Sequence, residues 1–314
     1  MSSQPESLPT DPTVVLLVGE GRSGTTLVDM LLGELDRVVS VGELIFIWSR
    51  GVVDNQLCGC GESFDSCGTW NDILIEYDRR KRRLSENEYL VYRNIGSMLR
   101  FPALLFGVNT GRKKDIVKSI ISSYDELYRS ISKVTDAEII VDSSKAVPFA
   151  YLLLRYSNLR IKLIHVVRDS RAVTFSRQKR KIRKEIVDRV EYMPTVSTLR
   201  SALKWMVNNI STELVARRHD YVRITYEGLA ANPTETLGYL ASYMGRTTGE
   251  FLKILSGTSD VLMSAHHTIS GNPSRFDRGM VEIRCDDRWR KEMKSWKKLL
   301  VTFVTWPLLW RYYH

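Results

Sequence analysis

The segment with the clearest chemical potential follows a short apolar run. Residues 13–18, Thr-Val-Val-Leu-Leu-Val, are typical of a strand buried on both faces of a sheet. The glycine-containing loop that comes next, Gly19-Glu-Gly-Arg-Ser-Gly24, leads into a predicted helix over residues 25–35. A strand, a loop and a helix in this order point backbone N–H groups and the positive end of the helix dipole at one spot. We therefore predict an anion-binding loop rather than a tight turn without a ligand.

The loop has the spacing of a Walker A motif without its lysine. Gly19, Gly24 and Thr26 match the motif. Thr25 stands where the lysine is expected, and Arg22, three residues earlier, can supply the missing positive charge. The missing lysine argues against a P-loop NTPase or a small-molecule kinase.

A second basic residue stands at the end of another predicted strand. Arg168 follows the apolar run 161–167, and Ser176 lies about two turns into the next predicted helix. Open α/β sheets bind ligands at the carboxyl ends of their strands. A phosphate between the two side chains would receive a forked guanidinium and a hydroxyl. Alone, the pair is equally typical of a surface ion pair; beside the first loop, it indicates a second phosphate site.

These two motifs resemble those of the sulfotransferase family, whose members use 3′-phosphoadenosine 5′-phosphosulfate (PAPS). Residues 22–27, Arg-Ser-Gly-Thr-Thr-Leu, are similar to the family's 5′-phosphosulfate loop, and Arg168 with Ser176 is similar to its 3′-phosphate motif. The resemblance extends from residue 13 to about residue 280. It implies a nucleotide-binding set of Arg22, Ser23, Gly24, Thr25, Thr26, Leu27, Arg168, Ser176, Tyr226 and Arg275.

Three further segments support the resemblance. Residues 142–145, Asp-Ser-Ser-Lys, are similar to a stretch that follows a strand in bacterial members. Residues 226–229, Tyr-Glu-Gly-Leu, are similar to a Tyr-Glu-Asp-Leu element near the nucleotide, with Gly228 in place of the aspartate. Residues 271–275, Gly-Asn-Pro-Ser-Arg, are similar to a late loop of the bacterial group.

Transfer of a sulfonate needs a base for the attacking hydroxyl or amine, donors to the sulfonate oxygens and positive charge at the leaving phosphate. Arg22, Thr25 and Thr26 suit the donor role. Lys145 is either a second cation near the leaving oxygen or an ordinary surface lysine at a strand end. This scheme needs no metal ion.

For the base we predict Glu43, because the Val-Gly-Glu-Leu run at 41–44 resembles the glutamate that follows the second strand in tyrosylprotein-type and many bacterial members. The alternative is that Glu43 pairs with Arg22 and only orients it. His266 or His267, in a polar loop, is the second candidate for the base. His165, inside a predicted strand, is expected to be a buried histidine with a satisfied hydrogen bond.

Three of the four cysteines lie close together in the sequence. Cys58, Cys60 and Cys67 could offer thiolates to a metal, but Cys285 is remote and no histidine is nearby. The sequence therefore predicts no metal site and a loop of reduced thiols, which is typical of a cytoplasmic chain.

The elements that must position these residues alternate between short β-branched runs and longer helical periods. This alternation predicts an α/β fold, a P-loop-like sandwich with a mainly parallel central sheet flanked by helices. Strands are expected at 13–18, 37–41, 137–141, 161–167 and 221–225. Between about 50 and 136 the strand signal nearly disappears. We interpret this stretch as a helical insertion that covers the site within one domain spanning 1–314.

The insertion and a later segment carry their own helix signals. Ser85-Glu-Asn-Glu88 has the spacing of a capping box, and an apolar face runs from Val117 to Val134. Asn232-Pro233 predicts a helix start, and Gly245 predicts the end of that helix.

Composition limits the classes of protein to which the chain can belong. The 314 residues include 46 Lys+Arg and 36 Asp+Glu, a net charge of +10, which favours an anionic partner. A 43% hydrophobic content excludes intrinsic disorder, and four cysteines exclude a disulfide scaffold. The first twelve residues resemble no signal peptide, and the apolar stretch 299–310 is too short to span a bilayer.

Two alternatives to a sulfotransferase stay open. Glu138 to Asp142 mimics a Walker B strand, which favours a P-loop NTPase or kinase. The charge alone would suit a non-catalytic binder of anionic polymers. The basic run 177–184 lacks interleaved aromatics, so we interpret it as a continued helix face or a rim for an anionic acceptor, with no nucleic-acid partner.

The acceptor is not determined by the sequence. Small molecules, carbohydrates, lipids and peptides all present a suitable oxygen. A helical stripe from Trp289 to Phe303 with adjacent lysines is typical of a packing face, and it leaves peripheral membrane contact open. The oligomeric state is equally undetermined.

Overall fold

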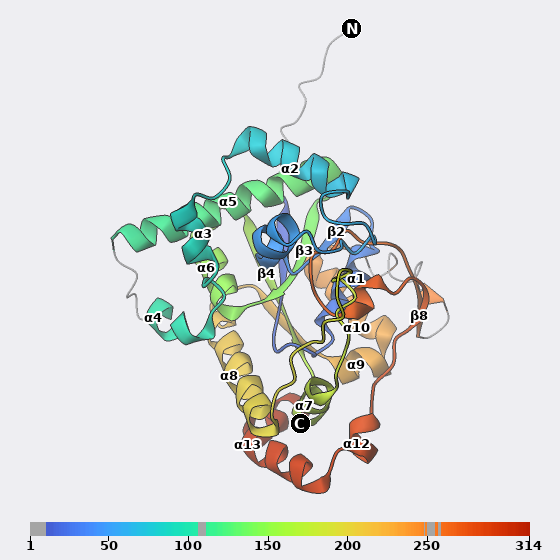
Figure 1. Cartoon of the computed structure of the whole chain (residues 1–314). Helices are drawn as coiled ribbons and strands as arrows, with labels where there is room; N and C mark the ends of the chain where they lie inside the picture. Colours follow the sequence, from blue (N-terminus) through green and yellow to red (C-terminus); the bar gives the residue numbers. More distant parts are fainter. Residues whose placement is uncertain (1–10, 106–110, 248, 250–254, 257–258) are drawn as a thin grey trace.

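A five-stranded sheet forms the centre of the molecule in the computed structural model, which describes residues 11–105, 111–247, 249, 255–256 and 259–314 (Figure 1). The strand order is β2-β3-β1-β4-β5, and every pairing is parallel. The predicted parallel α/β fold is therefore confirmed. The strands are β1 (Thr13–Val18), β2 (Val38–Gly42), β3 (Ile139–Lys145), β4 (Arg160–Val167) and β5 (Tyr221–Thr225).

One strand runs past its predicted end. β3 was expected to stop at Val141, yet it continues through three polar residues to Lys145, which pairs with Val18. The polar residues stay in the strand because their side chains find buried partners. Asp142 accepts hydrogen bonds from the hydroxyl of Tyr128 at 2.7 Å and from the N–H of Ser144 at 2.8 Å.

Helices cover both faces of the sheet, and β1 shows this directly. Val14 and Leu16 belong to one apolar core, whereas Val15 and Leu17 belong to the other, and none of the four is more than 2% exposed. The first core includes side chains from α5 (Arg112–Thr135) and α6 (Val147–Tyr156). The second includes side chains from α1 (Thr25–Gly33) and α10 (Pro233–Met244).

The remaining elements lie around this sandwich. α7 (Ser170–Gln178), α8 (Thr198–Ala216) and α13 (Ser295–Tyr313) pack against one another at one end of the molecule (Figure 1). Two short helices are α9 (Tyr226–Ala231) and α12 (Arg288–Glu292), and a 3-10 turn, η4, covers Pro273–Phe276. A small antiparallel sheet contains β6 (Leu255–Ser256), β7 (Asp260–Met263) and β8 (Gly279–Glu282).

Helical elements connect β2 to β3. They are η1 (Leu44–Phe46), the π-helical turn η2 (Ile47–Val53), α2 (Gly68–Arg80), α3 (Glu86–Tyr92), η3 (Met98–Arg100), α4 (Phe101–Leu105) and α5. The predicted capping box of Ser85 and Glu88 starts α3. Farther along the chain, Pro233 begins α10 as predicted, and Gly245 ends it at a φ of 82°.

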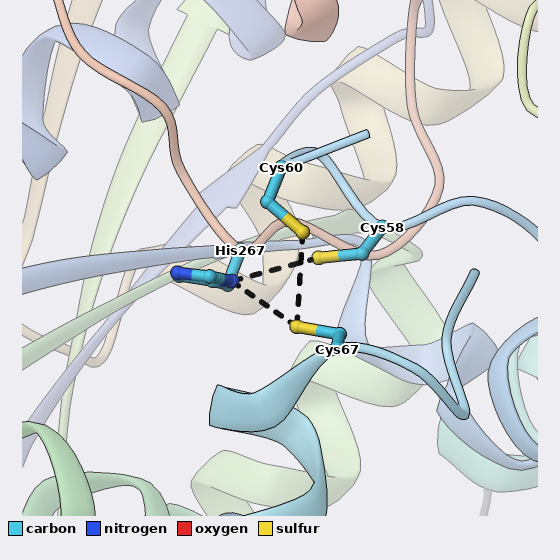
Figure 2. Close-up of side chains that lie close together, drawn as sticks. All are labelled: Cys58, Cys60, Cys67 and His267. Carbon is cyan, nitrogen blue, oxygen red and sulfur yellow. Dashed lines mark hydrogen bonds between the residues drawn. The ribbon is translucent and has the colours of Figure 1, made fainter. Parts of the chain in front are cut away.

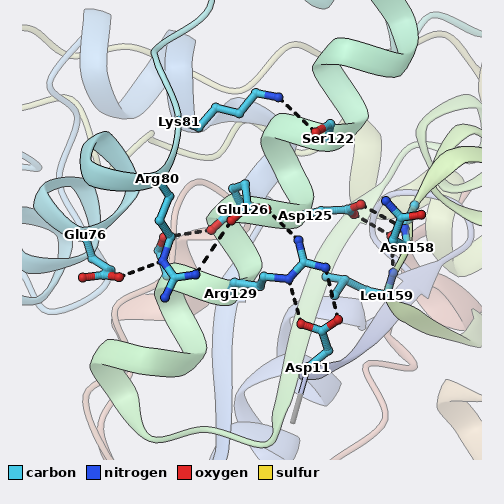
Figure 3. A network of polar contacts seen from close by, with 12 residues as sticks. Asp11, Glu76, Arg80, Lys81, Ser122, Asp125, Glu126, Arg129, Asn158 and Leu159 are labelled. Atoms are coloured by element: carbon cyan, nitrogen blue, oxygen red, sulfur yellow. Dashed lines mark hydrogen bonds and ion pairs between the residues drawn. The ribbon is translucent and has the colours of Figure 1, made fainter. Parts of the chain in front are cut away.

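A polar network ties α5 to its surroundings (Figure 3). Arg129 donates to Asp11, just before β1, and to Glu126, each at 2.7 Å. Asp125 accepts from Ser157 at 2.6 Å and from the N–H of Asn158 at 2.9 Å, in the turn that leads into β4. The network joins this helix to two strand starts at the edge opposite the carboxyl ends.

The predicted apolar stripe at 289–303 divides into two environments. Trp289 and Met293 are buried, whereas Trp296, Leu299 and Phe303 on α13 are 58%, 71% and 79% exposed. The interpretation of the stripe as one packing face is therefore wrong, because the backbone changes direction between α12 and α13. None of the described helices has both the length and the apolar content needed to cross a membrane.

Candidate active site

A pocket of about 540 Å³ opens at the carboxyl ends of the parallel strands. Each strand end supplies at least one lining residue: Arg22 after β1, Glu43 after β2, Lys145 at the end of β3, Arg168 after β4 and Tyr226 after β5. This is the edge at which open α/β sheets bind ligands. The structure thus brings together side chains that are up to 204 residues apart in the sequence.

The loop after β1 forms one wall through Gly21, Arg22, Gly24 and the first residues of α1. Gly24 precedes α1 with a φ of 90°, and a Cβ there would lie 2.2 Å from the ring of Tyr226. No described side chain caps the N-terminus of α1, and its first turn contains no acidic residue. This helix end is therefore available to an anion.

Arg168 is held between three neighbours. Its guanidinium lies 4.6 Å from the centre of the Tyr226 ring and donates to the carbonyls of Arg22 at 3.4 Å and Asp286 at 3.2 Å. Its buried Nε has no hydrogen-bond partner among the described residues. A buried donor without a partner costs free energy unless a ligand or water accepts from it. Ser176, on α7, lines the same pocket.

Glu43 and Lys145 form an ion pair in the pocket wall, with Oε1 and Nζ 2.5 Å apart. The hydroxyl of Ser270 donates to Oε2 of Glu43 at 3.4 Å. Burial alone would raise the pKa of the Glu43 carboxyl, but the Lys145 ammonium, with Arg50 and Ser270, outweighs it and holds the pKa below its ordinary value. Glu43 is therefore ionised at neutral pH and able to accept a proton. The alternative pairing of Glu43 with Arg22 is replaced by this pair with Lys145.

Cations outnumber acidic groups around the pocket. The acidic lining residues are Glu43 and Asp286, and the basic ones are Arg22, Lys145, Arg168, Arg177, Lys181, Arg200 and Lys204. Burial, followed by the nearby charges of Arg22 and Arg168, lowers the pKa of Lys181. Such a surplus of positive charge suits a polyanionic ligand.

Sequence reasoning missed four of these basic residues. Arg177 and Lys181 belong to the run 177–184, for which we predicted a continued helix face or a rim for an anionic acceptor. The continued helix is wrong because α7 ends at Gln178 and the chain then passes along the pocket, whereas the rim for an acceptor stays a prediction. Arg200 and Lys204 lie four residues apart on α8 and therefore on one face of the helix. This spacing is the sequence pattern that could have identified them. A second basic run, residues 79–83, pairs with nearby acidic residues instead, for instance Arg83 with Asp78 at 2.8 Å.

Two of the residues assigned to the nucleotide do not line the pocket. Arg275 is 2% exposed and donates to the carbonyls of Leu57, at 2.7 Å, and Thr268. It joins two loops and lies outside the pocket lining. Ser23 is 1% exposed, and its hydroxyl has no partner among the described residues.

The histidines lie outside the pocket as well. His266 is buried with Nε2 2.8 Å from a carboxylate oxygen of Glu34, and His267 lies beside the cysteines. Neither is positioned to act as the base, so Glu43 is the candidate that the geometry retains. His165 is fully buried as predicted, with Nε2 2.7 Å from Oδ1 of Asn209, while its Nδ1 has no partner among the described residues.

The prediction that the cysteines lack a fourth ligand is wrong. His267, 200 residues beyond Cys67, lies with its Nδ1 3.2 Å from that thiol and 3.8 Å from Sγ of Cys58 (Figure 2). The sequence spacing could not show this because the two loops meet only in the folded chain.

Asp142, the carboxylate of the Walker B-like run, does not line the pocket. It is buried against Tyr128 and Ser144, and burial raises its pKa to about 6. This run therefore supplies no carboxylate to the site, which removes the specific support for an NTPase.

The sheet order and the glycine-containing loop between the central strand and α1 define a P-loop-like α/β protein. Within that class the chain belongs to the sulfotransferase domain family, whose model matches residues 12–275. No curated protein matches the chain. Among solved structures, the sulfotransferase domain from the Synechococcus PCC 7002 olefin synthase is 17% identical, with a TM-score of 0.52 and 98% of each chain covered. The sulfotransferase domain from the curacin biosynthetic pathway is also 17% identical, with a TM-score of 0.49, and the match covers 94% of this chain and 98% of that one.

Proposed function

We propose that the protein transfers the sulfonate group of PAPS to a hydroxyl, or an amine, of an acceptor. The observation that carries the proposal is that both predicted phosphate motifs, Arg22 with residues 24–27 and Arg168 with Ser176, line one pocket with the Glu43–Lys145 pair. Membership of the sulfotransferase family supports the same reaction.

The chain's own residues fit a nucleotide with several phosphate charges. The N-terminus of α1 has no acidic residue in its first turn, and Arg168 retains a buried donor without a partner among the described residues. Arg22 and the first turn of α1 would hold the 5′-phosphate and the sulfonate. Arg168 and Ser176 would hold the 3′-phosphate.

PAPS, when bound, supplies an activated sulfonate whose sulfur–oxygen bond to the 5′-phosphate breaks as the acceptor oxygen bonds to sulfur. Glu43 takes the proton that the acceptor hydroxyl loses, because its carboxylate is ionised and faces the pocket. Arg22, Thr25 and Thr26 donate hydrogen bonds to the sulfonate oxygens. Lys145 stabilises the negative charge on the released phosphate oxygen.

In this scheme the Glu43–Lys145 pair changes the basicity of Glu43 during the reaction. Lys145 holds the pKa of Glu43 low in the free site, where the carboxylate and the ammonium are in contact. When the ammonium turns toward the leaving phosphate, Glu43 loses its closest cation and becomes a stronger base.

Ligand binding and turnover test the proposal separately. Adenosine 3′,5′-bisphosphate should raise the thermal unfolding midpoint, whereas ATP with Mg²⁺ should not. The reverse result would overturn the proposal in favour of an NTPase. Labelled PAPS should then be incubated with phenols, carbohydrates, lipids and tyrosine peptides in turn, because the acceptor class depends on the pocket walls, which the fold alone does not determine.

The proposal includes a cytoplasmic location, which is supported by four cysteines free of disulfides.

A further inference from the structure

A second constellation of reactive side chains lies outside the pocket. Cys58, Cys60, Cys67 and His267 each offer one ligand atom, and the four atoms all lie within 4.8 Å of one another. We propose that this Cys3His cluster binds one structural zinc ion.

The separations fit a tetrahedral site. With zinc–sulfur bonds of about 2.3 Å and zinc–nitrogen bonds of about 2.0 Å, tetrahedral ligands lie about 3.8 Å (S–S) and about 3.5 Å (S–N) apart. The sulfurs of Cys60 and Cys67 are 3.8 Å apart, and Nδ1 of His267 is 3.8 Å from Sγ of Cys58 and 3.2 Å from that of Cys67. Figure 2 shows the three thiols and the ring nitrogen converging on one space. Three thiolates and an imidazole in this geometry favour zinc.

The outer contacts of His267 suit a metal ligand. Its Nε2 lies 3.2 Å from the hydroxyl of Thr69, so Nε2 can donate while Nδ1 binds the metal. The indole N–H of Trp70 donates to the carbonyl of His267 at 2.9 Å. Both partners belong to the first turn of α2, directly after Cys67. The histidine is thus oriented by the helix whose N-terminus carries one of the thiols.

Hydrogen bonds hold together the two loops that provide the ligands. The N–H of Gly59 donates to the carbonyl of Thr268 at 2.9 Å, and a Cβ at Gly59 would lie 2.3 Å from the hydroxyl of that threonine. Arg275 donates to the residues just before Cys58 and just after His267, Leu57 and Thr268. Its buried guanidinium also offsets the single negative charge of zinc with three thiolates.

Burial assigns the ion a structural role. Cys58 and Cys67 are each 1% exposed, and four protein ligands leave no open position for a substrate or water. Two residues after His267, Ile269 accepts from the N–H of Glu43 at 2.7 Å and donates to the carbonyl of Val41 at 2.8 Å. The ion therefore locks the loop that holds Glu43 in the pocket wall, without taking part in any transfer chemistry.

Metal content tests the inference independently of any sulfotransferase activity. The untagged protein, purified without chelator, should contain about one zinc per chain by elemental mass spectrometry. Cys67→Ser and His267→Asn should each lower the content at least severalfold. Cys285→Ser is the matched control, since this cysteine lies outside the cluster, and its variant should keep the zinc.

Cobalt reconstitution keeps the test decisive if a variant fails to fold. Wild-type protein stripped of zinc and given Co²⁺ should show thiolate-to-cobalt charge-transfer bands and the visible bands of a tetrahedral ion. Zinc removal should also lower the thermal unfolding midpoint, and zinc should restore it. A wild-type chain without zinc and without these bands, or one with a Cys60–Cys67 disulfide in the purified protein, would overturn the inference.

Discussion

The carboxylate of Glu43 and the ammonium of Lys145 lie 2.5 Å apart, although 102 residues separate them in the sequence. They meet because β2 and β3 are neighbouring parallel strands, so residues at their carboxyl ends reach the same edge of the sheet. The contact joins the candidate base to the candidate cation for the leaving group. It also means that a change of Lys145 alters the pKa of the Glu43 carboxyl.

Glu43→Gln should remove most turnover and preserve nucleotide binding. An amide cannot accept the acceptor's proton, and the loss of a base typically lowers the rate by about 10²- to 10⁴-fold. Affinity for adenosine 3′,5′-bisphosphate should stay the same or rise, because a negative charge leaves a cationic pocket. Single-turnover kinetics and calorimetry measure the two effects. The exposed Glu282→Gln serves as the control, and wild-type turnover in Glu43→Gln would exclude Glu43 as the base.

Lys145→Met should move the acidic limb of the pH–rate profile to higher pH. Without the ammonium, burial raises the pKa of Glu43, so the active carboxylate form is lost at a higher pH on acidification. Lys145→Arg keeps the charge and should leave the limb near its wild-type position while lowering kcat. The profile of kcat/KM against pH distinguishes the variants. An unmoved limb in Lys145→Met would show that the titrating group is not Glu43.

Arg168→Ala should weaken binding of adenosine 3′,5′-bisphosphate by about 10- to 100-fold, the usual value of charge-assisted hydrogen bonds. Arg168→Lys should recover only part of the affinity, because an ammonium lacks the fork of the guanidinium. Calorimetric titration measures both, with the exposed Arg189→Ala as control. Unchanged affinity in Arg168→Ala would place the 3′-phosphate elsewhere.

Gly24→Ala should destabilise the fold and also abolish tight nucleotide binding. The residue has a φ of 90°, and its new Cβ would lie 2.2 Å from the Tyr226 ring that supports Arg168. Gly245→Ala is a matched control, because that glycine has a φ of 82° with nothing within 4 Å. Both should lose about 1 kcal/mol from the backbone conformation alone. Urea unfolding and nucleotide titration together test this prediction, which fails if the two variants bind nucleotide equally well.

His165 should make the protein less stable in mild acid. Burial lowers its pKa to about 4 in the folded chain, against about 6.5 unfolded, so the unfolded state binds more protons between these values. Stability is therefore full above about pH 6.5 and falls as pH drops toward 4, by roughly 2 kcal/mol from pH 7 to 5. His165→Gln should reduce this fall in urea unfolding, whereas His219→Gln, at an exposed site, should not. Equal pH dependence in all three proteins would contradict the assignment.

Local sequence determined the parts of this protein whose partners are close in the chain. The β-branched and apolar runs of β1, β4 and β5, the capping box of Ser85 and the glycine at the end of α10 follow from side-chain periodicity and backbone preference. The strand–loop–helix arrangement around the predicted anion-binding loop also follows from the sequence, because β1, the glycines and α1 are contiguous within residues 13–33. The interactions that form these elements join residues a few positions apart, so the sequence alone predicts them.

Tertiary structure alone decided which distant groups meet. Parallel pairing of β2 with β3 brings Lys145 into contact with Glu43, and the chain that leaves α7 after Gln178 passes along the pocket with Lys181 in its lining. Folding also places His267 beside three cysteines that lie 200 or more residues earlier in the chain. Arg275 donates hydrogen bonds to both of the loops that provide these residues and does not line the pocket. Such contacts depend on strand order and loop packing, which spacing along the chain does not encode.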